Sequence, residues 1–302
     1  MRKALRKILI GLAAVLAAAI VLSLVGVAMF RGTPAWYRVA DGDRPTDAQR
    51  EQLARAAENK MIEAQNWAAT VRADAQRAQR ATESTTTAPV TARAQASHVI
   101  EFSDRELNAL FDKWSVLYGW RDKYAEYLDD PRVILQNDRL ILAGRMTELG
   151  GAVASFQFRP QLDAASGKLR IDLVRVTGGK LPLPEAAWVK WRDMIVDGTR
   201  KNLPSWRAQA RIDSSGAANF PAMAATLSRL LFATAAKQPA EPVLFLPLAG
   251  ERDSVPVKVT DVDVETGKLT LTVAPMTAAE RTALLERIRT PQGGDGARAS
   301  GN

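Results

Sequence analysis

Two pairs of carboxylates are the residues of this chain whose spacing could support chemistry. Asp129 and Asp130 are adjacent and precede a proline, and Asp261 and Asp263 lie two apart in a segment that alternates like a strand. The second pair points to one side of that strand, where it could bind a cation or act in acid–base catalysis. No third ligand accompanies it, so we favour a solvent-facing strand position.

Other reactive residue types are scarce. His98 is the only histidine, and the chain has no cysteine, which excludes disulfides, thiol catalysis and thiolate metal sites. Gly150-Gly151 lacks the ending of a phosphate-binding loop, and no nucleophile elbow occurs. Ser103 is better explained as a helix cap than as a nucleophile. We therefore expect no catalytic residues, no metal and no cofactor.

Apolar helix faces indicate a different kind of site. A tryptophan has a large apolar body and a polar N–H, which suits a core, a partner surface or a groove for amphiphiles. The expected domain contains five tryptophans: Trp114, Trp120, Trp188, Trp191 and Trp206. The candidates for an apolar cleft recur at helical spacing on two segments: Leu107, Leu110, Phe111, Trp114, Trp188, Trp191 and Ile195. The alternative is that these faces only cover a sheet.

The first candidate face belongs to a helix that begins at Ser103. Ser103 and Glu106 form a capping box, which satisfies free N–H groups at a helix start, and Leu117 continues the apolar face. From Arg132 the period changes to two, which predicts antiparallel strands with one apolar face. Turns are expected at Asn137-Asp138, Gly150-Gly151 and Ser166-Gly167.

The second candidate face belongs to a helix that follows Pro184, a residue suited to a first helical turn, and Gly198 is its expected end. Further helices are predicted over 221–236 and 277–289, the first with Leu227, Leu230 and Leu231 inward. Strands are predicted over 243–248, 255–264 and 269–273. The alternation of inward-facing and outward-facing residues shifts by one position between Val259 and Val262, which predicts a β-bulge.

The N-terminal segment predicts a membrane anchor. Residues 8–30 form an uncharged, almost wholly apolar run of about 23 residues, and about 20 span a bilayer as a helix. The run is too long for the apolar part of a cleaved signal peptide. The preceding cations, Arg2, Lys3, Arg6 and Lys7, favour the cytoplasmic side. We expect a single-pass protein of the bacterial inner membrane, with its N-terminus inside and its main domain outside the cytoplasm.

The charge of the chain does not predict nucleic-acid binding. The net charge is +8, from 41 Lys and Arg against 33 Asp and Glu. Residues 1–31 contain five cations and no acid, which leaves 36 cations against 33 acids in the rest. A nucleic-acid interface needs a basic stripe on the folded domain, and the sequence does not contain one.

A long helix is predicted over 46–80. Thr46 and Gln49 form its capping box. One seam of this helix is mostly alanine: Leu53, Ala57, Met61, Ala64, Ala68, Val71, Ala75 and Ala78. We favour packing against the protein's own domain over a dimerising stalk. The preceding Trp36 and Tyr37 fit either a membrane interface or a local packing contact.

These segments define the expected organisation. Residues 1–31 are the basic N-terminus and anchor, and 32–80 the juxtamembrane segment and helix. Residues 81–97 are a linker rich in Thr, Ala and Ser, 98–290 an α+β domain, and 291–302 a Gly-rich polar tail expected to be disordered. In the α+β domain, a curved antiparallel sheet is expected to pack against amphipathic helices.

This arrangement resembles the YpmS-type and LmeA-type bacterial envelope proteins. The resemblance covers about residues 98–275. It depends on the segment Phe-Ser-Asp-Arg-Glu-Leu-Asn-Ala-Leu-Phe at 102–111 and a late Val-Lys-Val-Thr-Asp-Val-Asp-Val-Glu-Thr-Gly-Lys-Leu-Thr-Leu hairpin at 257–271. Residues Glu106, Leu107, Asn108 and Leu110 match the helix motif. That family is related to tubular lipid-binding domains, so the resemblance implies a helix against a curved sheet with a lipid between them, and no catalytic residues.

The expected function is therefore non-catalytic binding of a lipid or other amphiphile in an apolar cleft. The alternative is a structural or assembly protein that binds another envelope protein through the helix at 46–80 and its aromatic faces. A cell-wall hydrolase would need an acidic cleft, for which the sequence gives no sign.

Overall fold

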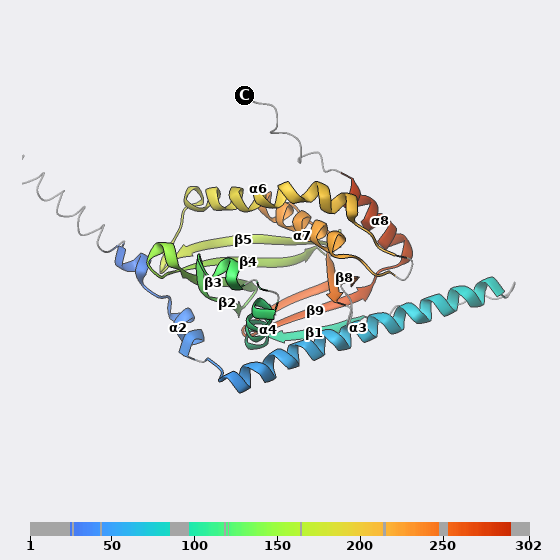
Figure 1. The fold of residues 1–302 in the computed structure, drawn as a ribbon, viewed down its shortest axis with the longest axis horizontal. Coiled ribbons are helices and arrows are strands. Elements are labelled where there is room, and N and C mark those ends of the chain that lie inside the picture. Colours follow the sequence, from blue (N-terminus) through green and yellow to red (C-terminus); the bar gives the residue numbers. More distant parts are fainter. Residues whose placement is uncertain are drawn as a thin grey trace, which may run out of the picture.

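The protein is an α+β structure with antiparallel sheets, as expected (Figure 1). It is described by a computed structural model, which covers residues 25, 27–42, 44–84, 97–117, 119, 121–163, 165–213, 216–247 and 253–290. The predicted linker and the C-terminal tail fall mostly or wholly outside these residues.

The strands of the described residues are divided between two sheets rather than forming one. The five-stranded sheet has the order β2 (Leu128–Gln136), β3 (Arg139–Met146), β4 (Ala152–Asp163), β5 (Lys168–Gly178) and β6 (Leu181–Pro182). The four-stranded sheet has the order β1 (His98–Ser103), β9 (Lys268–Pro275), β8 (Ser254–Glu265) and β7 (Val243–Pro247). The sequence did not reveal β1 or β6.

The helices cover the two sheets from different sides. They are α2 (Ala35–Gly42), α3 (Asp47–Ser84), α4 (Asp104–Leu117), α5 (Arg121–Tyr124), α6 (Glu185–Gln209), α7 (Phe220–Ala235) and α8 (Ala278–Arg289), with a 3-10 turn at Thr147–Leu149. In Figure 1, α6 and α7 lie along the five-stranded sheet, whereas α3 runs along the four-stranded sheet. Helices α6 and α3 therefore pack on different parts of the structure.

The long helix α3 packs against the protein's own domain, which is the favoured expectation. Its Ala57, Ala64 and Ala68 are buried in one cluster with Ile100 of β1 and Val257 of β8. Small side chains let the helix axis approach the sheet closely, and so α3 belongs to this hydrophobic core. This packing argues for keeping α3 with the α+β domain that the sequence predicts at 98–290.

The N-terminal part of the described chain crosses the end of the five-stranded sheet. The Lys180 N–H donates to the Met29 carbonyl at 2.9 Å, and a Cβ on Gly178 would overlap the ring of Phe30. Tyr37 is fully buried and its hydroxyl donates to the Asp130 carbonyl at 2.7 Å, which is a packing contact. The predicted anchor, 8–30, lies mostly outside the described residues. Among the residues that the structure describes, no helix is long and apolar enough to cross a bilayer.

Local sequence signals predicted several elements correctly. The capping boxes at Thr46 and Ser103 form as expected. Asn137-Asp138 is the turn between β2 and β3. The register of β8 against β9 shifts between Val259 and Asp261, which is the predicted β-bulge. Each of these features depends on residues close together in the chain.

Other expectations were wrong, because packing overrides local preference. Helix α6 continues past Gly198 to Gln209, since its next turns bury Leu203 completely. Leu227 of α7 is 51% exposed, because α7 packs through small residues such as Ala222 and Ala225. Leu117 lies at the end of α4 and is 66% exposed, so the apolar face of α4 ends before it.

Candidate functional site

The candidates on α4 lie in the packed core rather than in a cleft. Leu110 is buried in the cluster beneath α3, and Leu107 and Trp114 pack against the same cluster. The Trp114 indole N–H donates to Glu58 of α3 at 3.2 Å. Phe111 stacks on Tyr124 with the ring centroids 5.7 Å apart. The α4 face is therefore occupied by the protein's own side chains.

The polar residues of the same segment hold α4 between three elements. The Glu106 carboxylate accepts hydrogen bonds from the Ser103 N–H at 2.8 Å and from Lys60 of α3 at 2.6 Å. Asn108 accepts from the Val133 N–H and donates to the Val133 carbonyl, both at 2.7 Å. Asn108 thus takes the place of a neighbouring strand at the outer edge of β2. The motif on which the family resemblance rests has a structural role here.

The electrostatics of Glu106 agree with that role. Burial alone would raise its pKa, but the hydrogen bonds from Lys60 and Ser103 outweigh it and lower the pKa. A carboxylate stabilised in its charged form by fixed donors contributes to folding rather than to proton transfer. We therefore assign Glu106 to the structure and not to a catalytic site.

An apolar groove lies between the five-stranded sheet and helices α6 and α7. It has a volume of about 1060 Å³. Its apolar lining includes Phe156, Phe158, Leu173, Val176, Trp188 and Leu231. Of the residues predicted for a cleft, Trp188 lines this groove, whereas the side chains of Trp191 and Ile195 lie outside the described part. The two predicted faces do not meet, because α4 and α6 pack on different parts of the structure.

The pleat of the sheet places the groove side chains on one face. Phe156 lies opposite Val176, and Phe158 lies opposite Leu173. The register shifts between these two pairs, so Val174 has no direct partner and forms a bulge. Val174 also lines the groove and is 42% exposed. The alternation of β4 was visible in the sequence, but nothing in it indicated that α6 would leave this face partly uncovered.

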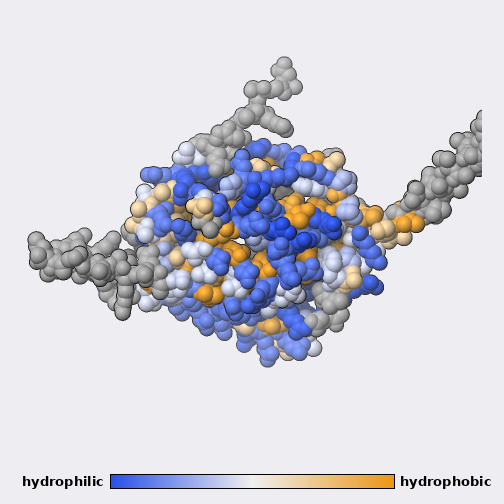
Figure 2. All heavy atoms as spheres, turned by 180° about the vertical axis from the view of Figure 1, so that it is seen from behind, coloured by the Kyte–Doolittle hydropathy of each residue, from blue (hydrophilic) through white to orange (hydrophobic). Residues whose placement is uncertain are grey.

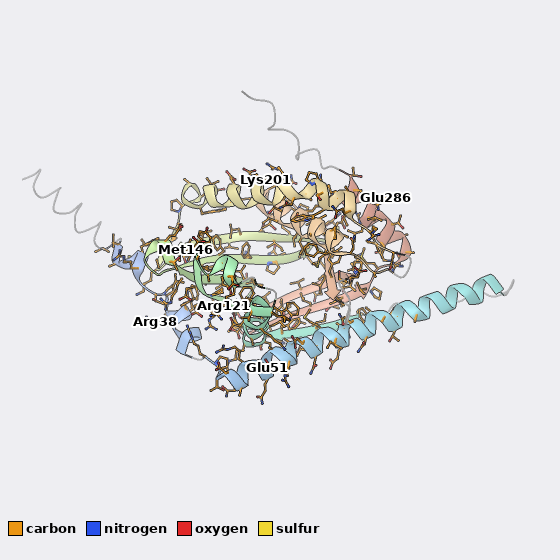
Figure 3. All side chains as sticks on the ribbon, viewed as in Figure 1. Arg38, Glu51, Arg121, Met146, Lys201 and Glu286 are labelled. Carbon is orange, nitrogen blue, oxygen red and sulfur yellow. The ribbon has the colours of Figure 1, made fainter. Side chains whose placement is uncertain are left out.

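The groove is open to solvent, because lining residues such as Val174 and Tyr127 are exposed. Seen from behind, hydrophobic surface gathers below α6 and through the middle of the molecule, between polar patches (Figure 2). Met146 lines the groove at the end of the sheet that lies beneath the first turns of α6 (Figure 3). Tyr127, which is half-exposed, lines the same end. An open apolar groove of this kind can accommodate an extended hydrocarbon chain.

Charged side chains border the groove. Arg192 lies over the ring of Trp188 at 5.6 Å and pairs with Asp193 at 3.0 Å and with Glu185 at 3.8 Å. Arg175 and Lys237 also line the groove. The site therefore combines an apolar floor with a polar rim, which is typical of ligand sites.

The carboxylate pairs and the histidine have other roles. Asp130 accepts from Arg44 at 2.6 Å and pairs with Arg132 at 2.8 Å, whereas Asp261 and Asp263 are exposed, as favoured from the sequence. His98 stacks on Trp67 with the ring centroids 5.1 Å apart. Among the described residues, no group of three or more His, Cys, Asp or Glu could hold a metal ion.

A second, charged cavity of about 880 Å³ lies between α3, α4 and β2. Burial raises the pKa of Asp112 within it, although Arg132 and Arg50 oppose this shift. Asp130 anchors two arginines here, and burial together with Asp130 raises the pKa of Tyr37. This network ties α2 and α3 to the edge of the sheet, so we assign it to the fold.

The chain was compared with protein-family models, with curated proteins and with solved structures, and nothing in these comparisons matches it. The functional argument therefore depends on the groove itself.

Proposed function

We propose that this protein binds the hydrocarbon chain of a lipid or similar amphiphile in the groove between the five-stranded sheet and α6. The observation that carries the proposal is the apolar groove of about 1060 Å³ lined by Phe156, Phe158 and Trp188. Each CH₂ group moved from water into such a groove contributes about 0.8 kcal/mol. About eight methylenes would contribute about 6 kcal/mol, which falls within the range of about 4 to 15 kcal/mol that association costs in lost translational and rotational freedom.

The position of the N-terminal segment supports a membrane source for the ligand. Met29 and Phe30 belong to the end of the predicted anchor, and they contact the sheet at Gly178 and Lys180. Pro182, two residues farther along the chain, lines the groove. An anchor at residues 8–30 would hold this end of the groove near the bilayer surface. The relationship to tubular lipid-binding domains stays a prediction, and the groove under α6 is a different site from the one that it implies beside α4.

The alternative function, binding of another envelope protein through the long helix, has less support. Its apolar seam would have to be available, but Ala57, Ala64 and Ala68 are buried against the protein's own sheet. We therefore develop only the lipid proposal. It requires no catalytic step.

Native mass spectrometry of the full-length chain, released from a mild detergent, tests the proposal. The wild-type protein should retain a bound lipid. Val174→Asp should lose it, because a carboxylate would be placed in the apolar groove. Leu227→Asp is the matched control, since Leu227 is an exposed apolar residue that does not line the groove. No retained lipid in the wild type, or equal retention in both variants, contradicts the proposal.

A further inference from the structure

We infer that the groove takes an amphiphile with two hydrocarbon chains, which lie side by side on the apolar face of the five-stranded sheet. The inference rests on the proposed lipid-binding function and adds the class of lipid. It is carried by the width of the groove and by Leu142, a leucine of β3 that is exposed beside the groove floor.

The groove is wider than one hydrocarbon chain. Its floor runs along β4 from the position opposite Met146 to Phe158, a distance of about 20 Å at the rise of a β-strand. A volume of about 1060 Å³ over this length gives a mean cross-section of about 50 Å². A hydrocarbon chain, whose carbon atoms pack at about 3.5 to 4.0 Å, fills a cross-section of only about 20 Å². A single chain would therefore leave more than half of the groove empty.

The apolar floor extends beyond the groove onto β3. Leu142 of β3 lies opposite Phe156 of β4, and Phe156 lies opposite Val176 of β5, so these three side chains share one face of the sheet. Adjacent strands are about 4.8 Å apart, and the floor across the three strands is thus about 10 Å wide. Two hydrocarbon chains laid side by side along β4 cover this width.

Leu142 is exposed although its strand does not lie at an edge of the sheet. Strand β3 pairs with β2 on one side and with β4 on the other, yet Leu142 is 42% exposed. Single exposed leucines are ordinary on protein surfaces, but the neighbouring positions on this face are covered. Leu140 packs against a cluster that includes Val264 of the other sheet, and the Leu128 side chain lies over Gly144. Leu142 is therefore a gap in an otherwise packed apolar face, directly beside the groove.

A second open position lies on the other side of β4. Val174 of β5 lines the groove and is also 42% exposed. A chain that covers Val174 on the β5 side leaves Leu142 in contact with water, and a second chain on the β3 side removes that exposed surface. When one headgroup joins both chains, the second chain binds at a high effective concentration. This favours a two-chain lipid over two separate single-chain molecules.

Native mass spectrometry of the full-length chain, delipidated in a mild detergent, tests the inference. The probes are dioleoyl-phosphatidylcholine, which has two chains, and oleoyl-lysophosphatidylcholine, which has one chain of the same kind and the same headgroup. The wild-type protein should bind one molecule of the first probe or two molecules of the second. At equal concentrations of the two probes, occupancy by the two-chain lipid should exceed occupancy by the single-chain lipid by about tenfold or more.

Two variants and a control locate the second chain. Leu142→Asp should lower occupancy by the two-chain lipid at least about fivefold, because a carboxylate would face hydrocarbon, and it should still bind one single-chain lipid. Leu142→Thr retains β-propensity and should act in the same direction, which keeps the test valid if the aspartate variant does not fold by circular dichroism. Leu227→Asp is the matched control and should bind like the wild type, since Leu227 is exposed and apolar but does not line the groove.

The outcomes distinguish the two proposals. Saturation with only one single-chain lipid, or two-chain binding that survives both Leu142 variants, overturns the inference and leaves lipid binding intact. Loss of both probes in a folded Leu142→Asp protein also overturns it, because Leu142 would then belong to the only chain site. Release of a co-purifying protein by Leu142→Asp would assign the exposed leucine to a protein partner and overturn it as well. Failure of the wild type to bind either probe overturns the lipid-binding function itself.

Discussion

Replacing Asn108 with alanine should destabilise the protein by about 2 kcal/mol, although Asn108 touches no proposed ligand. Its side chain makes two hydrogen bonds of 2.7 Å to the backbone of Val133, at the outer edge of β2. Each such bond contributes about 1 kcal/mol, and an unpaired buried partner costs about 1 to 3 kcal/mol. Val133 is half-buried, so water would replace part of the loss. Alanine also regains about 0.5 kcal/mol of helix propensity.

Urea unfolding of the full-length chain in a mild detergent, followed by tryptophan fluorescence, measures this effect. With a slope of about 2 to 3 kcal/mol per molar urea, the midpoint should fall by about 0.7 to 1 M. Asn108→Asp should be at least as unstable at neutral pH, because its carboxylate would face the carbonyls of Val133 and Asp104, to which Asn108 now donates.

The matched control is Asn66→Ala, which removes an exposed asparagine from helix α3. Its free energy of unfolding should change by less than about 0.5 kcal/mol. If Asn108→Ala and Asn66→Ala had the same midpoint, Asn108 would not be fixing the edge of β2, and our account of the helix motif would be refuted.

Three further predictions address the sheet end, the groove and pH. Gly178→Ala should lower the thermal midpoint, because its Cβ would overlap the ring of Phe30. Gly198→Ala is the control: no atom lies within 4 Å of its Cβ, and alanine should stabilise α6 by about 1 kcal/mol. A higher thermal midpoint for Gly178→Ala than for Gly198→Ala would contradict the packing at the sheet end. Trp206→Ala should cost about 3 kcal/mol in urea unfolding, since Trp206 packs against the core of α6, α7 and α8, whereas Trp188→Ala should cost less and weaken lipid retention. The lowered pKa of Glu106 predicts a contribution to stability that is present above its unfolded pKa of about 4.3 and is lost as the pH falls further. Glu106→Gln should therefore lose less stability than the wild type over this pH range. If the two proteins lost the same stability between neutral and acid pH, the structural role of Glu106 would be contradicted.

Local features of this fold could be predicted from the sequence because they depend on neighbouring residues. The capping box at Ser103 needs only Glu106, three residues away, and the turn at Asn137-Asp138 depends on its own backbone preferences. The β-bulge near Thr260 was visible as a change of alternation within one strand. The amphipathic character of α4 and the length of α3 were likewise evident from the period of their apolar residues.

The partner of each apolar face was decided only by the tertiary structure. The sequence placed Leu107 and Trp188 in one cleft, because both lie on amphipathic helices. In the structure, Leu107 packs between α3 and the strands, whereas Trp188 faces the groove formed with β4 and β5. Hydrophobic burial has no preferred direction, so an apolar stripe does not specify which surface will cover it.

The division of the strands into two sheets has the same cause. Strand β1 pairs with β9, although about 165 residues separate them. The Asp138 N–H, in the turn between β2 and β3, donates to the Val264 carbonyl of the other sheet at 2.7 Å. Such pairings depend on the packing of α3 and α6 on separate faces. The sequence by itself determined most of the helices and strands and the apolar face of α4, whereas the groove exists because long-range packing leaves one face of the five-stranded sheet only partly covered.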